Sequence, residues 1–322
     1  MIKTDDYNYA GIRKKLTTKW VGSRLSFCES VDSTNLRARQ EAENGAPHGT
    51  LIVADLQTSG RGRRGRSWQS PAGVNIYFSL ILRPDLAKDK ASMLTITMAH
   101  SVCKAIARET GLDCKIKWPN DIVVNGKKVC GILTEMGFEK DGGYYVVVGV
   151  GINVRSQHFA PELADKATSL EDEDGRLQKL SRSHLFAEIM SAFEEDYKSL
   201  MVCQDLTGIL ESYNHMLINR GAQVRVLDPK GEYEAKAGGI TKTGELLVET
   251  ADGTVMQVYA GEVSVRGIYG YVLEIYLWMI TGWCSAEPMP MSRNIILMSN
   301  LMPYRILLKM SLGSSVYFLQ KR

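Results

Sequence analysis

The chain has 322 residues, of which 44% are hydrophobic and 23% are charged. This composition suits one large or two modest folded domains and argues against extensive disorder. The formal net charge of +3 is too small to indicate a nucleic acid or an anionic membrane as a partner.

The six cysteines have no CxxC spacing and form no cluster with histidines, so the sequence predicts no structural metal site. The first 15 residues are polar, where a secretory signal peptide would have an apolar stretch. Free thiols and the lack of an export signal predict a cytoplasmic protein.

The first part of the chain predicts strands that alternate with helices. Strands are expected at residues 19–27, 50–57 and 75–84. A helix is expected from Asp32 or Ser33, either of which can cap its start, through Ala42. A second helix is expected near residues 90–110, where apolar residues recur at helical spacing.

The next part predicts a run of strands followed by two helices. The strands are expected at residues 114–118, 122–124, 127–136 and 144–154. Asn125-Gly126 favours a two-residue hairpin turn. The helices are expected at residues 183–200 and 207–217. A strand-rich sheet with helices packed on it is an α+β, or mixed α/β, layer architecture.

From residue 219 the pattern changes to short alternating strands separated by glycine-containing turns, which predicts a small β barrel. We therefore divide the chain into residues 1–218, 219–272 and 273–322. The last segment has an apolar stretch interrupted by Glu274 and Gly282, too short for a membrane span of about 20 apolar residues. No pattern organises the rest of this segment, and we assign it no structure or role.

A loop rich in arginine and glycine, GRGRRGRSW, occupies residues 60–68. Its glycines allow close approach of the backbone to a ligand, and its arginines suit phosphate or carboxylate. In isolation such a run is typical of nucleic-acid-binding segments or of a solvated charged surface. Here an apolar strand flanks it on each side, which favours a loop that clamps an anion.

Two further clusters lie between or on strands. KWPND at residues 117–121 would form a turn, which Pro-Asn-Asp favours unaided. On the next strand either Lys127 or Lys128 faces inward by alternation, where it needs an anionic partner. The alternative is an exposed edge strand that lysines protect from pairing.

GVGINV at residues 149–154 is close to a dinucleotide-binding fingerprint, but its sixth position is Val154 rather than glycine. We reject that interpretation. The sequence also has no GxxxxGK[ST] loop for ATP and no GxSxG motif of a serine hydrolase.

Together, and in this order, the motifs resemble those of biotin protein ligases. The resemblance rests on DSTN (32–35), Gln57, GRGRRGR-x-W (60–68), NIY (75–77), KWPND (117–121), KKVCGIL (127–133) and GVGIN (149–153). It covers about residues 15–271. It implies a class II aminoacyl-tRNA-synthetase-like biotin/lipoate ligase catalytic domain on a mixed sheet, followed by an SH3-like barrel.

The resemblance also implies a reaction. Such enzymes activate biotin with ATP and Mg²⁺ as biotinyl-5′-AMP and transfer it to a lysine of a biotin carboxyl carrier protein. The segment before Asp32 is too short for the DNA-binding domain that many bacterial members carry, so we expect no operator binding. The sequence leaves a homodimer open.

The resemblance assigns roles to individual residues. Biotin would be bound by Ser33, Thr34, Asn35, Gln57, Arg61, Gly62, Arg63, Tyr77, Lys128, Gly131, Gly149 and Gly151. The nucleotide would be bound by Arg66, Trp68, Lys117, Asn120 and Asn153. Catalysis would fall to Lys128 and Arg63, which offset the repulsion between carboxylate and phosphate, and to Asp121 at the incoming lysine.

Two alternatives stay open. A lipoate–protein ligase or octanoyltransferase shares the fold but would be expected to lack the GRGRRGR loop. A nucleic-acid-binding module built on that loop and the barrel would bind with an affinity that falls steeply with salt.

Overall fold

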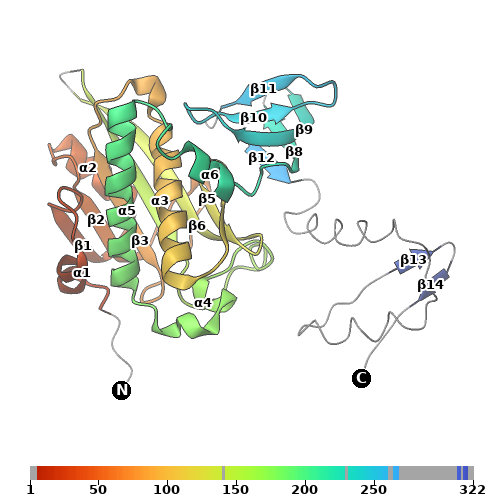
Figure 1. Cartoon of the computed structure of the whole chain (residues 1–322). Helices are drawn as coiled ribbons and strands as arrows, with labels where there is room; N and C mark the ends of the chain where they lie inside the picture. Colours follow the sequence, from red (N-terminus) through yellow and green to blue (C-terminus); the bar gives the residue numbers. More distant parts are fainter. Residues whose placement is uncertain are drawn as a thin grey trace. The chain divides into compact units, whose positions relative to one another are not determined.

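A seven-stranded mixed sheet forms the centre of the larger of two structural units, residues 1–273 and 274–322 (Figure 1). The computed structural model describes residues 6–139, 142–228, 231–259, 264–267, 310–312 and 315–317. The strands of the large sheet are β1 (Leu25–Val31), β2 (Leu51–Gln57), β3 (Ile76–Leu82), β4 (Cys114–Lys117), β5 (Asp121–Val124), β6 (Lys127–Phe138) and β7 (Tyr144–Ile152). Their spatial order is β1-β2-β3-β7-β6-β5-β4, with β1 and β2 parallel and the other neighbours antiparallel.

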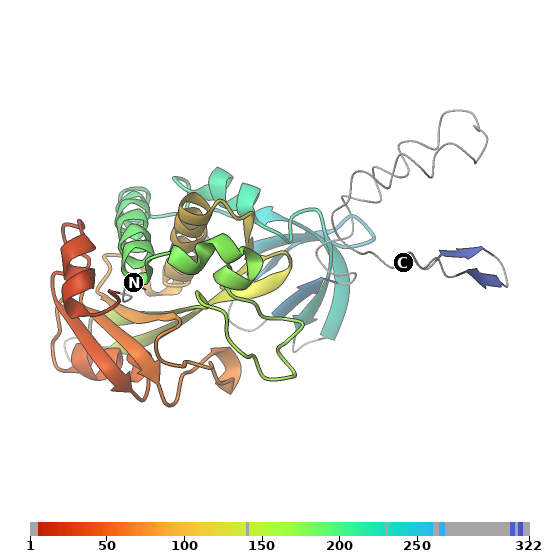
Figure 2. The same ribbon diagram turned by 90° about the horizontal axis from the view of Figure 1, so that it is seen from below.

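Helices cover both faces of this sheet. They are α1 (Tyr9–Lys15), α2 (Thr34–Glu43), α3 (Met93–Thr110), α4 (Leu170–Glu173), α5 (Arg182–Cys203) and α6 (Leu210–Met216), with 3₁₀ turns at Arg63–Gly65, Lys88–Lys90 and Gly175–Lys179. Figure 2 shows α3 and α5 together on one side of the sheet. Because successive strand residues point to opposite faces, Leu51 and Val53 join the core beneath these two helices, whereas Ile52 packs with residues of α2.

The elements agree in type with the expectations from the sequence, and some of their ends differ. The strand expected at residues 19–27 begins only at Leu25, because the preceding residues form a turn with Gly22 at φ 75°. The helix expected at 207–217 begins at Leu210. The turn predicted for KWPND lies between β4 and β5, as expected.

A five-stranded antiparallel sheet follows the helices, in the spatial order β11-β10-β9-β8-β12. Its strands are β8 (Gln223–Asp228), β9 (Gly231–Ile240), β10 (Leu246–Glu249), β11 (Val255–Val258) and β12 (Ser264–Gly267). Trp118 Nε1 donates to Gly244 O (3.0 Å), and Ile240 N donates to Asn214 Oδ1 of α6 (2.8 Å). These bonds connect the small sheet and its β9–β10 turn to α6 and to the turn after β4. The mixed α/β fold with a small β domain, predicted from the sequence, is confirmed.

The second unit contributes one described hairpin, β13 (Met310–Leu312) and β14 (Ser315–Tyr317). The expectations for the rest of residues 273–322 lie outside the described residues.

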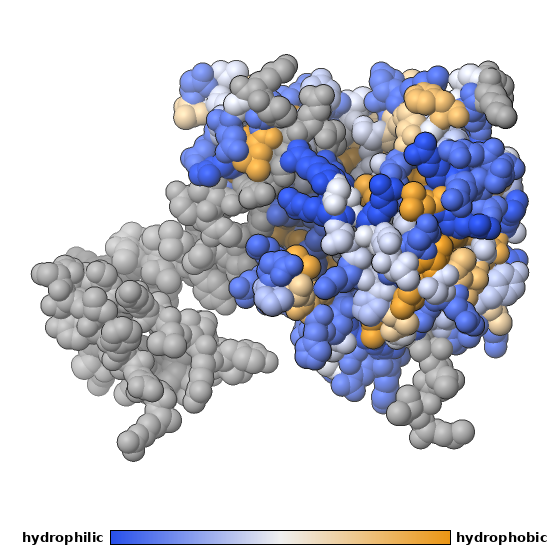
Figure 3. All heavy atoms as spheres, turned by 180° about the vertical axis from the view of Figure 1, so that it is seen from behind, coloured by the Kyte–Doolittle hydropathy of each residue, from blue (hydrophilic) through white to orange (hydrophobic). Residues whose placement is uncertain are grey.

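Some large hydrophobic side chains are exposed on the described surface. They are Tyr9, Met136, Phe138, Leu163, Val202, Val255, Met256 and Tyr259. On the face opposite that of Figure 1, hydrophobic residues occur in small groups among hydrophilic ones (Figure 3). Among the helices of the described residues, none combines the length and the apolar character needed to cross a bilayer.

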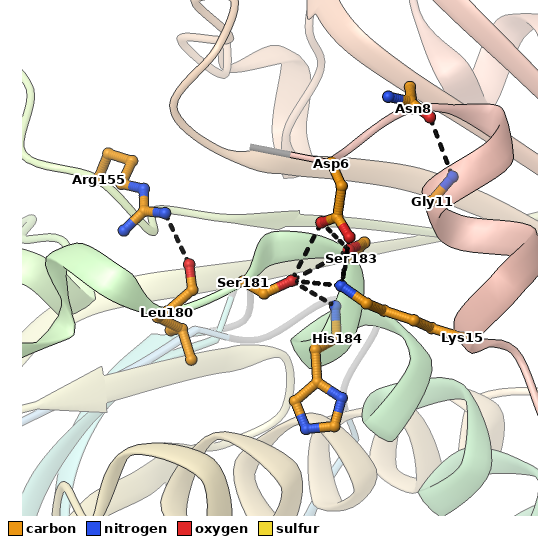
Figure 4. Close-up of polar contacts among 9 residues, drawn as sticks. All are labelled: Asp6, Asn8, Gly11, Lys15, Arg155, Leu180, Ser181, Ser183 and His184. Atoms are coloured by element: carbon orange, nitrogen blue, oxygen red, sulfur yellow. Dashed lines mark hydrogen bonds and ion pairs between the residues drawn. The ribbon is translucent and has the colours of Figure 1, made fainter. Parts of the chain in front are cut away.

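Lys15, the last residue of α1, ties this helix to the start of α5 (Figure 4). Its Nζ donates to Asp6 Oδ2 (2.5 Å), Ser181 Oγ (2.8 Å) and Ser183 Oγ (2.7 Å). Both serines donate in turn to Asp6 Oδ1. Burial acts to raise the pKa of Asp6, but the hydrogen bonds and charge of Lys15 and the bonds from the serines outweigh it, so the pKa is lowered.

Replacing Lys15 with methionine is expected to lower the free energy of unfolding by about 1 kcal/mol, because a partly exposed ion pair and its hydrogen bonds are lost. A lowered Asp6 pKa contributes stability that is complete above about pH 5 and disappears as the pH falls through the folded-state pKa. Urea unfolding should therefore show a smaller difference at pH 3 than at pH 7. The control is Lys14→Met, at an exposed lysine of the same turn, and a difference that is equal at both pH values would contradict the account.

Candidate functional site

A cavity opens where the start of α2, the arginine-rich loop and strands β6 and β7 meet. Its lining combines neutral polar side chains, cations and bare glycine backbone. The lining residues are Ser33, Thr34, Asn35, Gln57, Arg61, Gly62, Arg63, Trp68, Asn120, Lys128, Gly131, Ile132, Leu133, Gly149, Val150 and Gly151. The fold thus brings together residues that are more than 100 positions apart in the sequence.

One end of the cavity is neutral and polar. Ser33, Thr34 and Asn35 stand at the start of α2 and are almost completely buried. Thr34 N donates to Gln57 Oε1 (2.8 Å), and Gln57 Nε2 donates to Ser70 Oγ (2.9 Å). Because each amide atom of Gln57 already has a partner, its orientation is fixed before any ligand binds. This end suits a compact ring with both donors and acceptors.

The other end is cationic. Lys128 Nζ lies 2.7 Å from Asp121 Oδ1, and Arg63 Nη1 donates to Asn120 Oδ1 (2.7 Å). Burial lowers the pKa of the Arg63 guanidinium, and the negative charge of Asp121 partly offsets this effect. Arg61 also lines the cavity. Partly desolvated cations at one place attract carboxylate or phosphate groups more strongly than solvated ones do.

Trp68 packs against the backbone of β6 and β7, and two glycines make this possible. A Cβ at Gly151 would lie 2.5 Å from Trp68 Nε1, and one at Gly131 would lie 3.0 Å from Trp68 Cζ3. Lys128 Nζ is 5.2 Å from the centre of the indole, a cation–π distance. The indole therefore forms part of the cavity wall beside Lys128.

Five residues that the sequence assigned to the site do not line the cavity. Tyr77 is completely buried and its hydroxyl donates to Pro71 O (3.1 Å), while Asn153 Nδ2 donates to Thr168 O (3.0 Å). Asp121 is connected to the cavity through Lys128. The two remaining side chains are those of Arg66, which is exposed, and Lys117 on β4.

Two polar residues beside the cavity were missed by the sequence analysis. Ser79 on β3 and Glu135 on β6 both hydrogen-bond to Asn35. A signal for each was present. Ser79 is the polar residue in the otherwise hydrophobic strand IYFSLIL, and Glu135 is in phase with Gly131 along its strand.

The site holds no preformed metal cage in the part of the chain that the structure describes, where no group of three or more His, Cys, Asp or Glu side chains is placed to bind an ion. A divalent cation that enters with a nucleotide needs no such cage, because phosphate oxygens and water supply most of the ligands of Mg²⁺.

Comparison with known proteins gives consistent matches. Residues 27–153 match the biotin/lipoate A/B protein ligase family, and residues 221–266 match the biotin protein ligase C terminal domain. The chain is 40% identical over 256 residues to the bifunctional ligase/repressor BirA of Bacillus subtilis, which covers 79% of this chain and 78% of that protein. It is 30% identical over 251 residues to the biotin–[acetyl-CoA-carboxylase] ligase of Mycobacterium tuberculosis, covering 74% of this chain and 88% of that protein.

A solved structure is similar over the same region. The biotin protein ligase from Aquifex aeolicus, in complex with biotin and ATP, aligns with a TM-score of 0.67 and 31% sequence identity. The alignment covers 76% of this chain and 99% of that protein.

Replacing Gly151 with alanine is expected to push the Trp68 indole off the sheet, because the new Cβ would lie 2.5 Å from its Nε1. Tryptophan emission should shift to the red, and the shift should vanish when Trp68 is also changed to phenylalanine. The control is Gly175→Ala, where no heavy atom lies within 4 Å of the new Cβ. An unchanged spectrum in Gly151→Ala would contradict this packing.

Proposed function

This chain belongs to the biotin/lipoate A/B protein ligase family and is a biotin–[acetyl-CoA-carboxylase] ligase, and we propose that its cavity activates biotin with Mg·ATP before transfer to a carrier lysine. The observation that carries the proposal is the pairing of a neutral polar end with a cationic end in one cavity. The neutral polar end fits the ring system of biotin. The cationic end fits the biotin carboxylate next to a triphosphate.

In the first step the biotin carboxylate attacks the α-phosphorus of ATP, a P–O bond to the β-phosphate breaks, and pyrophosphate leaves. The two reactants are anions and repel each other. Lys128, Arg61 and Arg63 line the place where these groups would meet, and their charges would offset the repulsion and stabilise the α-phosphate of the adenylyl group as it is transferred. The product is biotinyl-5′-AMP, a mixed anhydride that reacts readily with water.

In the second step a neutral lysine amine of the carrier attacks the acyl carbon, and AMP leaves. Asp121 could take up the amine proton or orient the amine once Lys128 has turned to the ligand. The 2.7 Å Lys128–Asp121 ion pair supports this exchange of partners, because the aspartate holds the lysine beside the cavity beforehand. The chemistry needs no covalent enzyme intermediate.

The nucleotide would lie against the cationic end. Trp68 offers an aromatic surface for adenine after a shift from the sheet, and Asn120 lines the same end. Arg66 and Lys117 would reach the phosphates only after a movement of the loop or of the ligand toward them. Tyr77 and Asn153 would contact a ligand only after leaving their present hydrogen-bond partners, Pro71 O and Thr168 O.

The partner in the second step is proposed to be a biotin carboxyl carrier protein. The absence of operator binding, a possible homodimer and a cytoplasmic location stay predictions. The alternative of a nucleic-acid-binding module gains no support, because Arg61 and Arg63 of the arginine-rich loop line an inward cavity.

The proposed activity is tested by incubating the purified chain with Mg·ATP, biotin and an apo carrier domain, and detecting the modified lysine by mass spectrometry. Biotin should be incorporated at one carrier lysine, and parallel reactions with lipoate or octanoate should give no product. Transfer of lipoate in place of biotin would contradict the proposal.

Lys128→Ala should raise the barrier to adenylate formation by about 2–4 kcal/mol, as expected for the loss of a charge that stabilises a transferring group. The rate of pyrophosphate release measures the effect. Lys127→Ala is the matched control, because Lys127 precedes it on the same strand and does not line the cavity. Equal rates for the two variants would remove Lys128 from the mechanism.

Arg63→Gly should weaken retention of the adenylate, because the loop loses the guanidinium that is bonded to Asn120 across the cavity. Released adenylate would acylate lysines at random. Mass spectrometry of a mixture of the carrier with an unrelated protein should therefore detect biotin on both, whereas Arg64→Gly, at an exposed neighbour, should label the carrier alone. Labelling confined to the carrier in Arg63→Gly would contradict this role.

A further inference from the structure

A line of polar contacts crosses three strands at the neutral end of the cavity. Ser79 on β3, Gly149 on β7 and Leu133 on β6 are direct neighbours in the sheet. The amide of Asn35 lies over this row. Its Oδ1 is 2.6 Å from Ser79 Oγ, and its Nδ2 donates to Glu135 Oε2 (2.7 Å) and to Leu133 O (3.3 Å).

Gly149 makes this arrangement possible. A Cβ at this position would lie 1.9 Å from Asn35 Oδ1, which is far inside any allowed contact. The bare backbone of β7 therefore lets the amide reach from α2 across β7 to β6. A glycine in the middle of a strand usually weakens the strand. Gly149 is needed here because the side chain of Asn35 crosses β7 at this position.

Glu135 determines which way the Asn35 amide faces. A carboxylate accepts hydrogen bonds and cannot donate them, so the NH₂ group of Asn35 must point to it. The carbonyl oxygen of Asn35 then faces Ser79. Ser79 is completely buried, so the direction of its single proton is decided by its protein partners.

The direction of the Ser79 O–H bond determines how the Thr34 hydroxyl can take part in hydrogen bonds. Ser79 Oγ is near both Asn35 Oδ1 (2.6 Å) and Thr34 Oγ1 (2.9 Å), but it has one proton to give. Because Asn35 Oδ1 can only accept, it takes that proton, and Ser79 has none left to give to Thr34. The Thr34 hydroxyl gives its own proton to Gln57 Oε1 (3.1 Å) or to Ser79 Oγ. The lone pairs of Thr34 Oγ1 are then left as an acceptor at the cavity wall.

We propose that Glu135 is a positioning residue that, through Asn35 and Ser79, turns Thr34 into a hydrogen-bond acceptor and so selects a ligand ring that carries N–H donors. This inference rests on the proposed function. The cyclic urea of biotin has such donors, and the dithiolane ring of a lipoyl group has none. A polar site built for a donor rejects a ligand that lacks it, because the acceptor would be buried without a partner.

The test is a double-mutant cycle on the complete chain, with the Kd of biotin alone measured by calorimetry. Asn35→Asp places two acceptors opposite each other and should weaken biotin binding by about tenfold or more. Adding Glu135→Gln supplies an N–H donor to the new aspartate, whose other oxygen can again accept from Ser79. Asn35→Asp/Glu135→Gln should therefore recover most of the affinity for biotin. The single variant Glu135→Gln completes the cycle.

A matched control separates this effect from a general change of charge. Asn35→Asp/Glu139→Gln has the same net charge as the restored variant, but Glu139 directly follows β6 and pairs with Arg83. It should bind biotin as weakly as Asn35→Asp. In turnover assays the KM for biotin should follow the Kd, while the KM for ATP stays within about twofold. Equal recovery by the two double variants, or no recovery by either, would overturn the proposal.

A second measurement tests the same role of Glu135 without Asn35→Asp, in case that variant does not fold. The wild type should bind biotin about tenfold or more tightly than an analogue methylated at the ureido nitrogens. Glu135→Gln alone allows the Asn35 amide to turn its NH₂ group toward Ser79, which then donates its proton to Thr34, so this variant should lose most of that preference. Ser79→Ala is the control, because alanine has no proton to give to Thr34, whose hydroxyl keeps Gln57 Oε1 as an acceptor. An unchanged preference in Glu135→Gln would contradict the role of Glu135. Binding of biotin without any carrier labelling would instead defeat the proposed function alone.

Discussion

The bare backbone of β7 is the constraint on which the rest of the site depends. Gly149 and Gly151 lie on a strand that is paired on both sides, and a methyl group at either position would collide with a side chain of the cavity wall. Through Gly149 the amide of Asn35 reaches from α2 to β6, and through Gly151 the Trp68 indole rests on the sheet. One strand thus sets the position of the polar end and of the aromatic wall beside the cations.

The electrostatics of the site follow from the same packing. The arginine-rich loop brings Arg63 against Asn120, and the hairpin of β5 and β6 places Lys128 beside Asp121. The small domain contacts the turn before this hairpin, since Trp118 Nε1 donates to Gly244 O in the turn between β9 and β10. A cation held by a nearby acid can exchange that partner for a substrate anion without first being drawn from bulk water.

Much of this could be predicted from the sequence, because its strongest signals are local. The alternation along β6 placed one lysine inward, and the structure identifies it as Lys128. The rejected dinucleotide interpretation of GVGINV agrees with the finding that both glycines lie within a strand instead of at a turn into a helix. Ser79 and Glu135 were not predicted, because a polar residue in a hydrophobic strand and an acid in phase with Gly131 do not reveal that both side chains meet Asn35 of a helix.

The central claim is that this cavity joins biotin to a nucleotide and holds the product. The most direct measurement is a single-turnover reaction with the carrier omitted, in which biotin, Mg·ATP and an excess of the chain are mixed and quenched over time. The account predicts pyrophosphate release that requires biotin, with biotinyl-5′-AMP remaining bound in an amount equal to the biotin supplied. Pyrophosphate release that is independent of biotin, or none at all, would contradict it.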